Sequence, residues 1–407
     1  MRLLILSLFA QSLSAALSVA TFSADVTPAV GDPVAYVPAR SIEDPLHARG
    51  IVLLGSGKPI VLCAVDWIGI GNAGHDLFRQ ALAKAARTDP ARVAVHTLHQ
   101  HDGPRFDPGA EAYLAKAGLA GKVFSNSFAN AAIARTAAAL SQSLAKAQPI
   151  THLAFGKAKV DKVASNRRIL GPDGKVKVGR MSASKIPEAI AAPEGTIDPF
   201  LQLLAFYHND APVAVLTYYA THPQSYYGKG DVTSEFVGLA RAQRQREVPG
   251  PLHIHFNGAS GNVAAGKYND GSPAMRPVLT ARMAAAMKQA FDTASRIPLP
   301  KAIDWRTTSV ALPNAAHIQR KPLTAKLLDA DAKFEDRRSA AVHLAWLDRV
   351  DAAHRIEISA LRLGDLVILH LPGELFVEYQ LAAQRMRPDR KVLMAAYGDF
   401  GPGYIGT

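Results

Sequence analysis

Short apolar segments that favour strands alternate with segments of helical periodicity, and this alternation constrains the fold more than any other feature. Residues 51–54 and 59–68 predict a strand pair, residues 76–88 a helix, and residues 92–101 another strand. Further strands are predicted at 21–26, 200–208, 213–220, 252–256, 356–363 and 366–371, and further helices at 125–147, 234–245, 275–295, 335–353 and 374–386. Residues 165–196 predict a long surface loop. No repeat or linker divides the chain, so we expect one large α/β domain, with mixed β-sheets and surrounding helices.

Residues 1–20 have the basic start, apolar middle and small-residue exit of a secretory signal. A membrane anchor is the alternative, but Gln11, Ser12 and Ser14 interrupt a run that is already short for a span, which needs about 20 residues. We therefore expect an exported protein, secreted or periplasmic. The single cysteine, Cys63, lies in the apolar stretch 60–65, which excludes an intrachain disulfide and predicts a buried strand position.

The formal net charge is +12, which favours anionic partners such as lipid headgroups or nucleic acid. Lys and Arg are scattered singly rather than gathered in a stripe, and no nucleic-acid motif is present. We interpret the charge as a solubility feature with some attraction to a membrane surface, and expect no nucleic-acid partner.

The densest chemical signal is a cluster of histidines at the end of the strand predicted at 92–101. Successive strand side chains point to opposite faces, so His99 and His101 share one face and His96 takes the other. Two imidazoles on one face can bind a metal together, or one can bind metal while the other contacts substrate. Asp102 is placed to orient one ring through its second nitrogen. The alternative is that the three histidines cluster by chance on a polar strand end. Gly103-Pro104, which ends the strand directly after them, favours an active site.

Two further strands end in possible ligands. His222 precedes Pro223, which ends a strand, and Glu374 follows a sharp turn after the strand at 366–371. Taken alone, His222 is more simply interpreted as a hydrogen-bonded core histidine, and Glu374 as a carboxylate at a helix N-terminus. Together with His99, however, they form a His, His, Glu set that can leave a position open for an activated water on zinc.

Glycine-rich segments follow the strand at 252–256 and fill residues 397–404. Such strand exits let the backbone approach a ligand and present amide donors to an oxyanion, although a tight turn is the alternative. His253 and His255 precede the first segment by a few residues, so we expect them to be structural.

Taken in order, these segments resemble the N-terminal catalytic domain of the neutral/alkaline non-lysosomal ceramidases, over nearly all of residues 21–407. The matching motifs are Ala24-Asp25-Val26-Thr27-Pro28, Asp44-Pro45-Leu46-His47-Ala48-Arg49, His99-Gln100-His101, Asn166-Arg167, His222-Pro223, Gly261-Asn262-Val263, Pro372-Gly373-Glu374 and Tyr404-Ile405-Gly406-Thr407.

The resemblance implies that His99, His222 and Glu374 hold Zn²⁺, with Tyr404 as a fourth ligand or close catalytic neighbour. The metal would lower the pKa of its bound water toward about 7 and so supply a hydroxide. His101 and Arg167 would bind and polarise the substrate carbonyl. The family reaction is hydrolysis of the N-acyl bond of ceramide to a fatty acid and sphingosine, which implies a lipid or small-molecule substrate and a role in sphingolipid metabolism.

The resemblance also implies that three residues, Asn166, Gly261 and Asn262, contribute to substrate binding. The family's Gly-Asp-Val-Ser-Pro-Asn loop is here Gly261-Asn262-Val263-Ala264-Ala265-Gly266, which excludes a serine nucleophile at that loop and leaves a metal-activated water. The family's His-Thr-His-Ser-Gly-Pro is here His-Gln-His-Asp-Gly-Pro, which indicates a divergent subgroup with its own substrate.

The chain stops at Thr407, so we expect the family's immunoglobulin-like C-terminal domain to be absent. An esterase or lactonase on the same scaffold, and a lipid- or carbohydrate-binding homologue without turnover, are the alternative functions.

Overall fold

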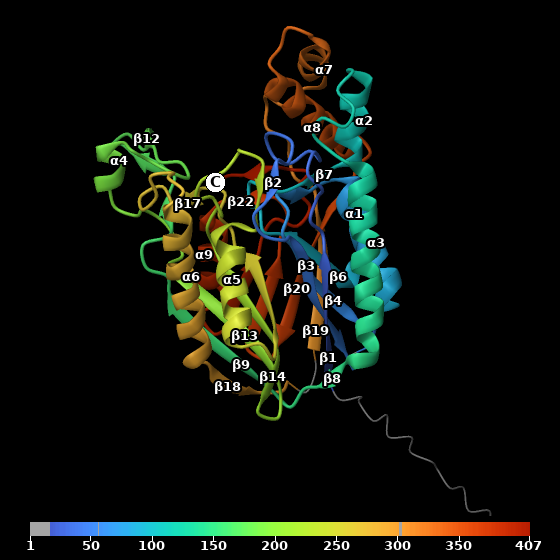
Figure 1. Cartoon of the computed structure of the whole chain (residues 1–407), viewed down its shortest axis with the longest axis vertical. Coiled ribbons are helices and arrows are strands. Elements are labelled where there is room, and N and C mark those ends of the chain that lie inside the picture. The colour runs from blue at the N-terminus through green and yellow to red at the C-terminus, as the bar shows by residue number, and fades with distance from the viewer. Residues whose placement is uncertain (1–16, 56, 301–302) are drawn as a thin grey trace, which may run out of the picture.

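The computed structural model describes residues 17–55, 57–300 and 303–407, and in these residues the longer strands form three sheets (Figure 1). The first sheet has the order β6-β4-β3-β1-β8, from β6 (Val93–Thr97), β4 (Ile60–Val65), β3 (His47–Leu54), β1 (Ser18–Asp25) and β8 (Gln148–Pro149). The second has the order β16-β14-β13-β9-β18, from β16 (Leu252–Asn257), β14 (Ala211–Tyr219), β13 (Phe200–His208), β9 (His152–Lys159) and β18 (Ser295–Pro298). The third has the order β19-β20-β21-β23, from β19 (Ile303–Val310), β20 (Ile356–Leu363), β21 (Leu366–His370) and β23 (Lys391–Ala395).

Short two-stranded pairs lie at one end of these sheets. They are β2 (Ser41–Ile42) with β15 (Asp231–Val232), β5 (Gly69–Ile70) with β7 (Arg105–Phe106), β10 (Ser165–Asn166) with β17 (Val263–Ala264), β11 (Arg168–Leu170) with β12 (Val176–Gly179), and β22 (Glu374–Leu375) with β24 (Tyr404–Ile405). The helices are α1 (Ala73–Ala86), α2 (Pro108–Lys116), α3 (Asn126–Ser143), α4 (Pro187–Ala191), α5 (Glu235–Glu247), α6 (Met275–Asp292), α7 (Arg320–Leu328), α8 (Phe334–Asp351) and α9 (Val377–Met386).

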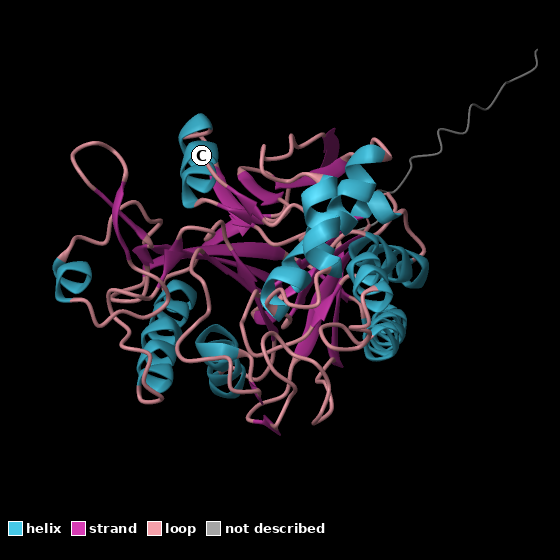
Figure 2. Ribbon diagram, turned by 90° about the horizontal axis from the view of Figure 1, so that it is seen from above, coloured by secondary structure: helices cyan, strands magenta, loops and turns pink. Residues whose placement is uncertain are grey.

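The main core lies between the inner faces of the three sheets. Leu62 of the first sheet, Ile254 of the second and Leu393 of the third belong to one buried apolar cluster. Helices α1 and α3 cover the outer face of the first sheet, and α5 and α6 cover the second, so the strands lie at the centre of the molecule and most helices at its periphery (Figure 2). Because both faces of these two sheets are covered, their strands are apolar along most of their length.

Each large sheet ends in a parallel strand pair: β4 with β6, β14 with β16, and β21 with β23. The carboxyl ends of the three outer strands are joined by hydrogen bonds. Thr97 N donates to Tyr397 O at 2.9 Å, Ala396 N to Asn257 O at 2.9 Å, and Asn257 Nδ2 to Leu98 O at 3.1 Å. The fold therefore brings three strand ends to one place, which is where sites form in α/β proteins.

The α/β class with mixed sheets is confirmed, and so is the buried strand position of Cys63. Several boundaries were wrong. The strand predicted at 92–101 ends at Thr97, the helix predicted at 374–386 begins at Val377, and the loop predicted at 165–196 contains β10, β11, β12 and α4. Helices α2 and α7 and strands β9, β19 and β23 were not predicted; the exposed face of β19, for example, has no apolar alternation to identify it.

Residues 1–16 of the predicted signal segment lie outside the described residues. Strand β1 begins at Ser18 and pairs with β3 from Ser18↔Leu54 onward, so the last residues of the predicted segment belong to the first sheet. Export stays a prediction. In the part of the chain that the structure describes, no helix has the length and apolar character to cross a bilayer.

Candidate metal centre

The segment after β6 carries His99 and His101, and a left-handed turn rather than strand alternation brings their rings together. Leu98 N still donates to Val65 O, but His99 has a φ of +64°, which reverses the chain direction. A positive φ is costly for a residue with a β-carbon and is concentrated at functional sites. The two rings do lie side by side, but the prediction that they share one face of a strand was wrong, because the strand ends at Thr97.

Four side chains converge at this point. Nε2 of His99 lies 3.2 Å from Nε2 of His101 and 3.2 Å from Oε2 of Glu374, and Nε2 of His222 lies 3.2 Å from the same carboxylate oxygen. One imidazole nitrogen from each of His99, His101 and His222 lies within 4.8 Å of the other two. His99, His222 and Glu374 are 2%, 1% and 5% exposed, so they meet away from bulk water.

Backbone carbonyl groups orient two of the rings. Nδ1 of His99 lies 2.7 Å from Ile68 O, and Nδ1 of His222 lies 2.7 Å from Ser260 O. A carbonyl oxygen only accepts, so each Nδ1 carries the proton and each Nε2 presents its lone pair to the centre. Nδ1 of His101 instead lies 2.5 Å from the hydroxyl of Tyr36.

Asp102 does not orient a ring. Its Oδ1 accepts from Gly228 N at 2.8 Å and its Oδ2 lies 3.8 Å from Arg276, so the carboxylate points to the 224–231 segment. The prediction of Asp102 as a partner of a histidine ring was therefore wrong, and main-chain oxygens take that role.

The charge states of the cluster suit a cation. Burial lowers the pKa of His222 to about 4, and burial together with the neighbouring His99 and His222 lowers the pKa of His101 well below its usual value. Burial alone would raise the pKa of Glu374, but His99 and His222 outweigh it and keep that pKa well below its usual range. Neutral imidazoles and an ionised carboxylate are the forms that bind metal.

The donors also fit a metal by position. Nε2 of His222 and Oε2 of Glu374 are buried and have no hydrogen-bond partner within the described residues. Lone pairs held 3.2 Å apart without a proton between them repel, and a cation among them removes that cost. Tetrahedral zinc with ligand bonds of about 2.0–2.1 Å separates its ligand atoms by about 3.3 Å, close to the spacing found here.

Glu374 is positioned by the glycine-rich loop after β16. Gly261 N donates to Leu375 O at 2.8 Å, and a β-carbon at Gly261 would lie 2.4 Å from Glu374 O, so only glycine permits this approach. Oδ1 of Asn262 accepts from Val377 N at 2.8 Å and Nδ2 donates to Glu378 at 2.8 Å, which holds the start of α9. Gly261 and Asn262 thus hold the segment that carries Glu374 in place. Their predicted contact with substrate stays a prediction.

Arg167 and Tyr404 lie together at the rim of the centre. Strand β24 pairs with β22 in the register Glu374↔Tyr404, and Nη1 of Arg167 donates to the Tyr404 hydroxyl at 3.0 Å. Tyr404 is 55% exposed. Burial of the hydroxyl and the adjacent Glu374 raise the pKa of Tyr404 to about 12, so the phenol is a neutral hydrogen-bond donor at neutral pH. Its predicted role as a fourth ligand stays a prediction.

Asn166 is buried and its amide is used by the backbone. Nδ2 donates to Thr196 O at 2.8 Å and Oδ1 accepts from Arg168 N at 3.0 Å. These bonds fix the segment that carries Arg167, which is a supporting role; the predicted substrate contact of Asn166 stays a prediction.

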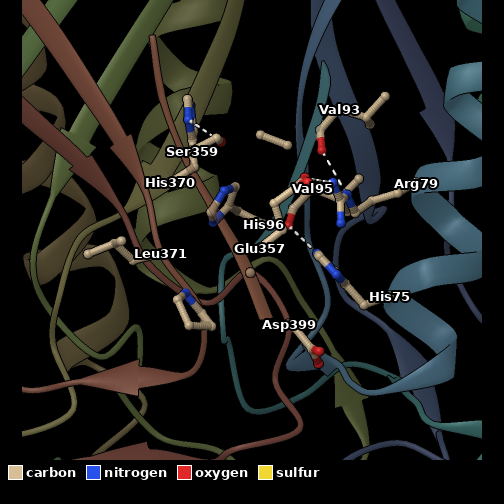
Figure 3. Close-up of a pocket in the computed structure, with 13 residues that line it drawn as sticks. His75, Arg79, Val93, Val95, His96, Glu357, Ser359, His370, Leu371 and Asp399 are labelled. Carbon is tan, nitrogen blue, oxygen red and sulfur yellow. Dashed lines mark hydrogen bonds and ion pairs between the residues drawn. The ribbon is translucent and has the colours of Figure 1, made fainter. Parts of the chain in front are cut away.

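His96 lies apart from this centre, as predicted. Its Nδ1 lies 2.7 Å from Ala396 O, and it lines a separate polar pocket with His75 and His370, between β6 and the third sheet (Figure 3). His253 and His255 are also buried away from the centre; Nε2 of His253 lies 3.1 Å from Val248 O and Nδ1 of His255 lies 2.9 Å from the Thr217 hydroxyl.

Aromatic residues that the sequence did not single out line the centre. Tyr397 stacks on His99 with ring centroids 4.5 Å apart, Phe400 lies 5.3 Å from the same ring, and Tyr36 lies 5.9 Å from that of His101. Tyr397 and Phe400 belong to the glycine-rich segment 397–404, in which the sequence pointed to the glycines and to Tyr404. Tyr36 sits in a turn-rich segment with no motif, so no signal in the sequence identifies it.

Comparison with solved structures shows that the three-sheet arrangement is similar to the fold of the neutral ceramidases. The chain matches a structure described as a ceramidase complexed with C2, with a TM-score of 0.68 and 17% sequence identity, covering 97% of this chain and 70% of that one. It also matches the crystal structure of neutral ceramidase from Pseudomonas aeruginosa, with a TM-score of 0.65 and 18% identity, covering 96% of this chain and 68% of that one. No family model and no curated protein matches the sequence. At this level of identity the likeness establishes the fold, and this chain is a divergent example of it.

Proposed function

We propose that this protein is a zinc-dependent hydrolase that cleaves an N-acyl amide bond in a ceramide-like lipid or a related acyl substrate. The observation that carries the proposal is the convergence of His99, His222 and Glu374, with two buried ligand atoms left without a partner. The ceramidase-like fold supports it.

In this proposal His99, His222 and Glu374 hold the metal, and His101 stands next to it facing the substrate. Zinc, when bound, polarises a carbonyl and activates water. The Arg167 guanidinium and the Tyr404 hydroxyl lie beside Glu374 and are placed to donate to the oxygen of the amide carbonyl as charge develops on it. Neutral His101 is placed to accept a proton from the attacking water and return it to the leaving amine. Ala264, which stands where the family has serine, has no nucleophile to offer.

Metal analysis of the purified protein tests the metal centre directly. We expect about one equivalent of zinc in the wild type, and loss of that metal in His99→Ala and His222→Ala. His253→Ala removes a buried histidine away from the centre and is the matched control. A wild-type protein that holds no transition metal would contradict the proposal.

A panel of acyl amides and their ester analogues tests the reaction. We expect amide turnover that disappears in Glu374→Ala. Turnover of the ester alone would identify an esterase or lactonase, and binding without turnover would identify a lipid- or carbohydrate-binding homologue.

Export and contact with a membrane surface are part of the same proposal. The hairpin β11–β12 carries Leu170 and Val176, which are 56% and 53% exposed, and Lys175 and Lys177 lie beside them. Exposed apolar side chains flanked by lysines suit the headgroup region of an anionic bilayer. The hairpin follows Arg167 directly, so a lipid held there would lie near the centre.

A further inference from the structure

Arg105 differs from the other arginines of the chain. Among the arginines of the described residues, Arg105 alone combines two properties: it is not exposed, and its side chain has no hydrogen bond or ion pair. Its Nε is buried without a partner. Burial lowers the pKa of its guanidinium to about 10, which still leaves it charged at neutral pH. A guanidinium nitrogen that is buried without a hydrogen-bond partner is unfavourable unless a ligand supplies one.

Arg105 lies at the wall of the metal centre. Strand β7 pairs with β5 in the register Gly69↔Arg105, and both residues line a mostly apolar cavity of about 30 Å³ together with Phe400. The Phe400 ring also packs against His99, with ring centroids 5.3 Å apart. One aromatic ring therefore separates the cavity of Arg105 from the metal ligands.

A second arginine adds positive charge to this region. Arg338 and Val342 are four residues apart on α8 and share a face of that helix, and Val342 lines the same cavity. Nη1 of Arg338 donates to Ala35 O at 3.1 Å, and no carboxylate of the described residues lies within 4.0 Å of it. The next residue along, Tyr36, is the one whose hydroxyl meets His101.

In the described residues, neither arginine has a carboxylate within the 4.0 Å of an ion pair. We propose that Arg105, with Arg338 beside it, binds an oxyanion of the substrate, a carboxylate or a phosphate, while the scissile amide lies at His99, His222 and Glu374. An arginine fork recognises carboxylates and phosphates through paired hydrogen bonds to two of their oxygens. The substrate class is then an N-acylated molecule with an acidic group near the amide, in place of a neutral ceramide. This inference rests on the proposed hydrolase function.

Paired substrates that differ only in charge test this inference. N-hexanoylglycine is compared with N-hexanoylglycinamide, and the phosphate ester of N-hexanoylethanolamine with N-hexanoylethanolamine. We expect kcat/KM of the zinc-loaded wild type to favour the anionic member by about 10- to 100-fold, as for a hydrogen bond to a charged group. The pair that shows the preference identifies the oxyanion as carboxylate or phosphate.

Two substitutions assign the preference to Arg105. Arg105→Gln removes the charge and is expected to abolish the preference, so that kcat/KM of the anionic member falls to that of its neutral partner in the same variant. Arg105→Lys keeps the charge but lacks the fork, and it is expected to retain part of the preference for the anionic member. A partial preference in this variant would show that loss of folding is not the cause of the effect in Arg105→Gln. Arg296→Gln is the matched control, because Arg296 is exposed on β18 at the opposite end of the sheets (Figure 1).

Calorimetric binding of the same four compounds to Glu374→Gln separates this inference from the proposed function. If Glu374→Gln binds the anionic members preferentially and the wild type turns over none of the compounds, the oxyanion site is retained and the hydrolase function is rejected. Equal binding and equal turnover of charged and neutral members would overturn the oxyanion site and leave the hydrolase intact. An anion preference that survives in Arg105→Gln would also overturn the assignment.

Discussion

Asp66 lies beneath the segment that carries His99 and His101, and its ion pair with Arg241 is buried. Oδ1 and Oδ2 accept from the two terminal nitrogens of Arg241 at 2.6 and 2.7 Å, and the side chains are 0% and 2% exposed. The main-chain oxygen of Asp66 accepts from Gln100 Nε2 at 2.7 Å, so the pair is connected to the histidine segment. Removing one charge from such a pair leaves the other buried and uncompensated.

We expect Asp66→Asn to lower the free energy of unfolding by about 3–5 kcal/mol at pH 7, measured by urea denaturation. Asp389→Asn is the control, because Asp389 pairs with Arg387 at the surface, and we expect no measurable change. An unchanged denaturation midpoint for Asp66→Asn would show that the buried pair contributes nothing net.

The same carboxylate predicts a pH dependence. Burial alone would raise the pKa of Asp66, but the charge and hydrogen bonds of Arg241 keep it below the ordinary 3.8. A lowered folded-state pKa gives stability that is fully present above the unfolded value and is lost as pH falls through the folded value. The stability gap between wild type and Asp66→Asn should therefore be constant above about pH 5 and narrow below about pH 3.8. A gap that widens on acidification would contradict this sign.

At the scale of elements, the packing of the glycine-rich loop on β22 decides where Glu374 lies. A β-carbon at Gly261 would meet Glu374 O at 2.4 Å and Phe376 at 3.0 Å. We expect Gly261→Ala to displace β22, to lower stability by about 1–3 kcal/mol, and to reduce bound metal. Thermal unfolding and metal content measure both effects. At Gly250 a β-carbon would meet nothing within 4 Å, so Gly250→Ala should change neither.

The hairpin β11–β12 supports a separate prediction about lipid. We expect the protein to sediment with vesicles that contain phosphatidylserine, and less so at high salt, because lysines at a membrane surface act through screened charge. The double variant Leu170→Ser, Val176→Ser should reduce this binding. Leu77→Ser, which removes an exposed leucine on α1, should not. Equal sedimentation of both variants would reject the hairpin as the contact.

Local patterns predicted the elements best where burial leaves a clear apolar pattern. Strand β13 and the start of α6 were predicted to the residue, because β13 is an apolar run buried on both faces and the buried positions of α6 recur at helical spacing. The proposed ligands His99, His222 and Glu374 were identified from the sequence because each follows a recognisable strand end. Their approach to one another depends on the left-handed turn at His99 and on bonds between distant strand ends, such as Thr97 with Tyr397. No local pattern encodes these, and Tyr36 and Arg105 were missed for the same reason.

At the scale of the whole molecule, the proposed metal would connect the three sheets. His99 follows the first sheet, His222 the second and Glu374 the third, so one ion bound by all three holds three strand ends together. A ligand that binds only the folded state stabilises it by RT ln(1 + [L]/Kd), about 2.7 kcal/mol at 100 times Kd. Stripping the metal should therefore lower the stability of the entire chain rather than of one loop.

We expect chelation with EDTA to lower the unfolding temperature in a calorimetric scan, with a single transition before and after, and zinc to restore it. A chain of this size should shift by several degrees, since about 1 kcal/mol corresponds to roughly 2–4 °C in domains of 150–250 residues and to less in longer ones. The effect should persist in His253→Ala and vanish in His222→Ala, because the first residue lies in the same second sheet but away from the centre. A shift of equal size in His222→Ala would mean that the stabilising ion binds at another site. The stabilisation by metal would then not come from His99, His222 and Glu374.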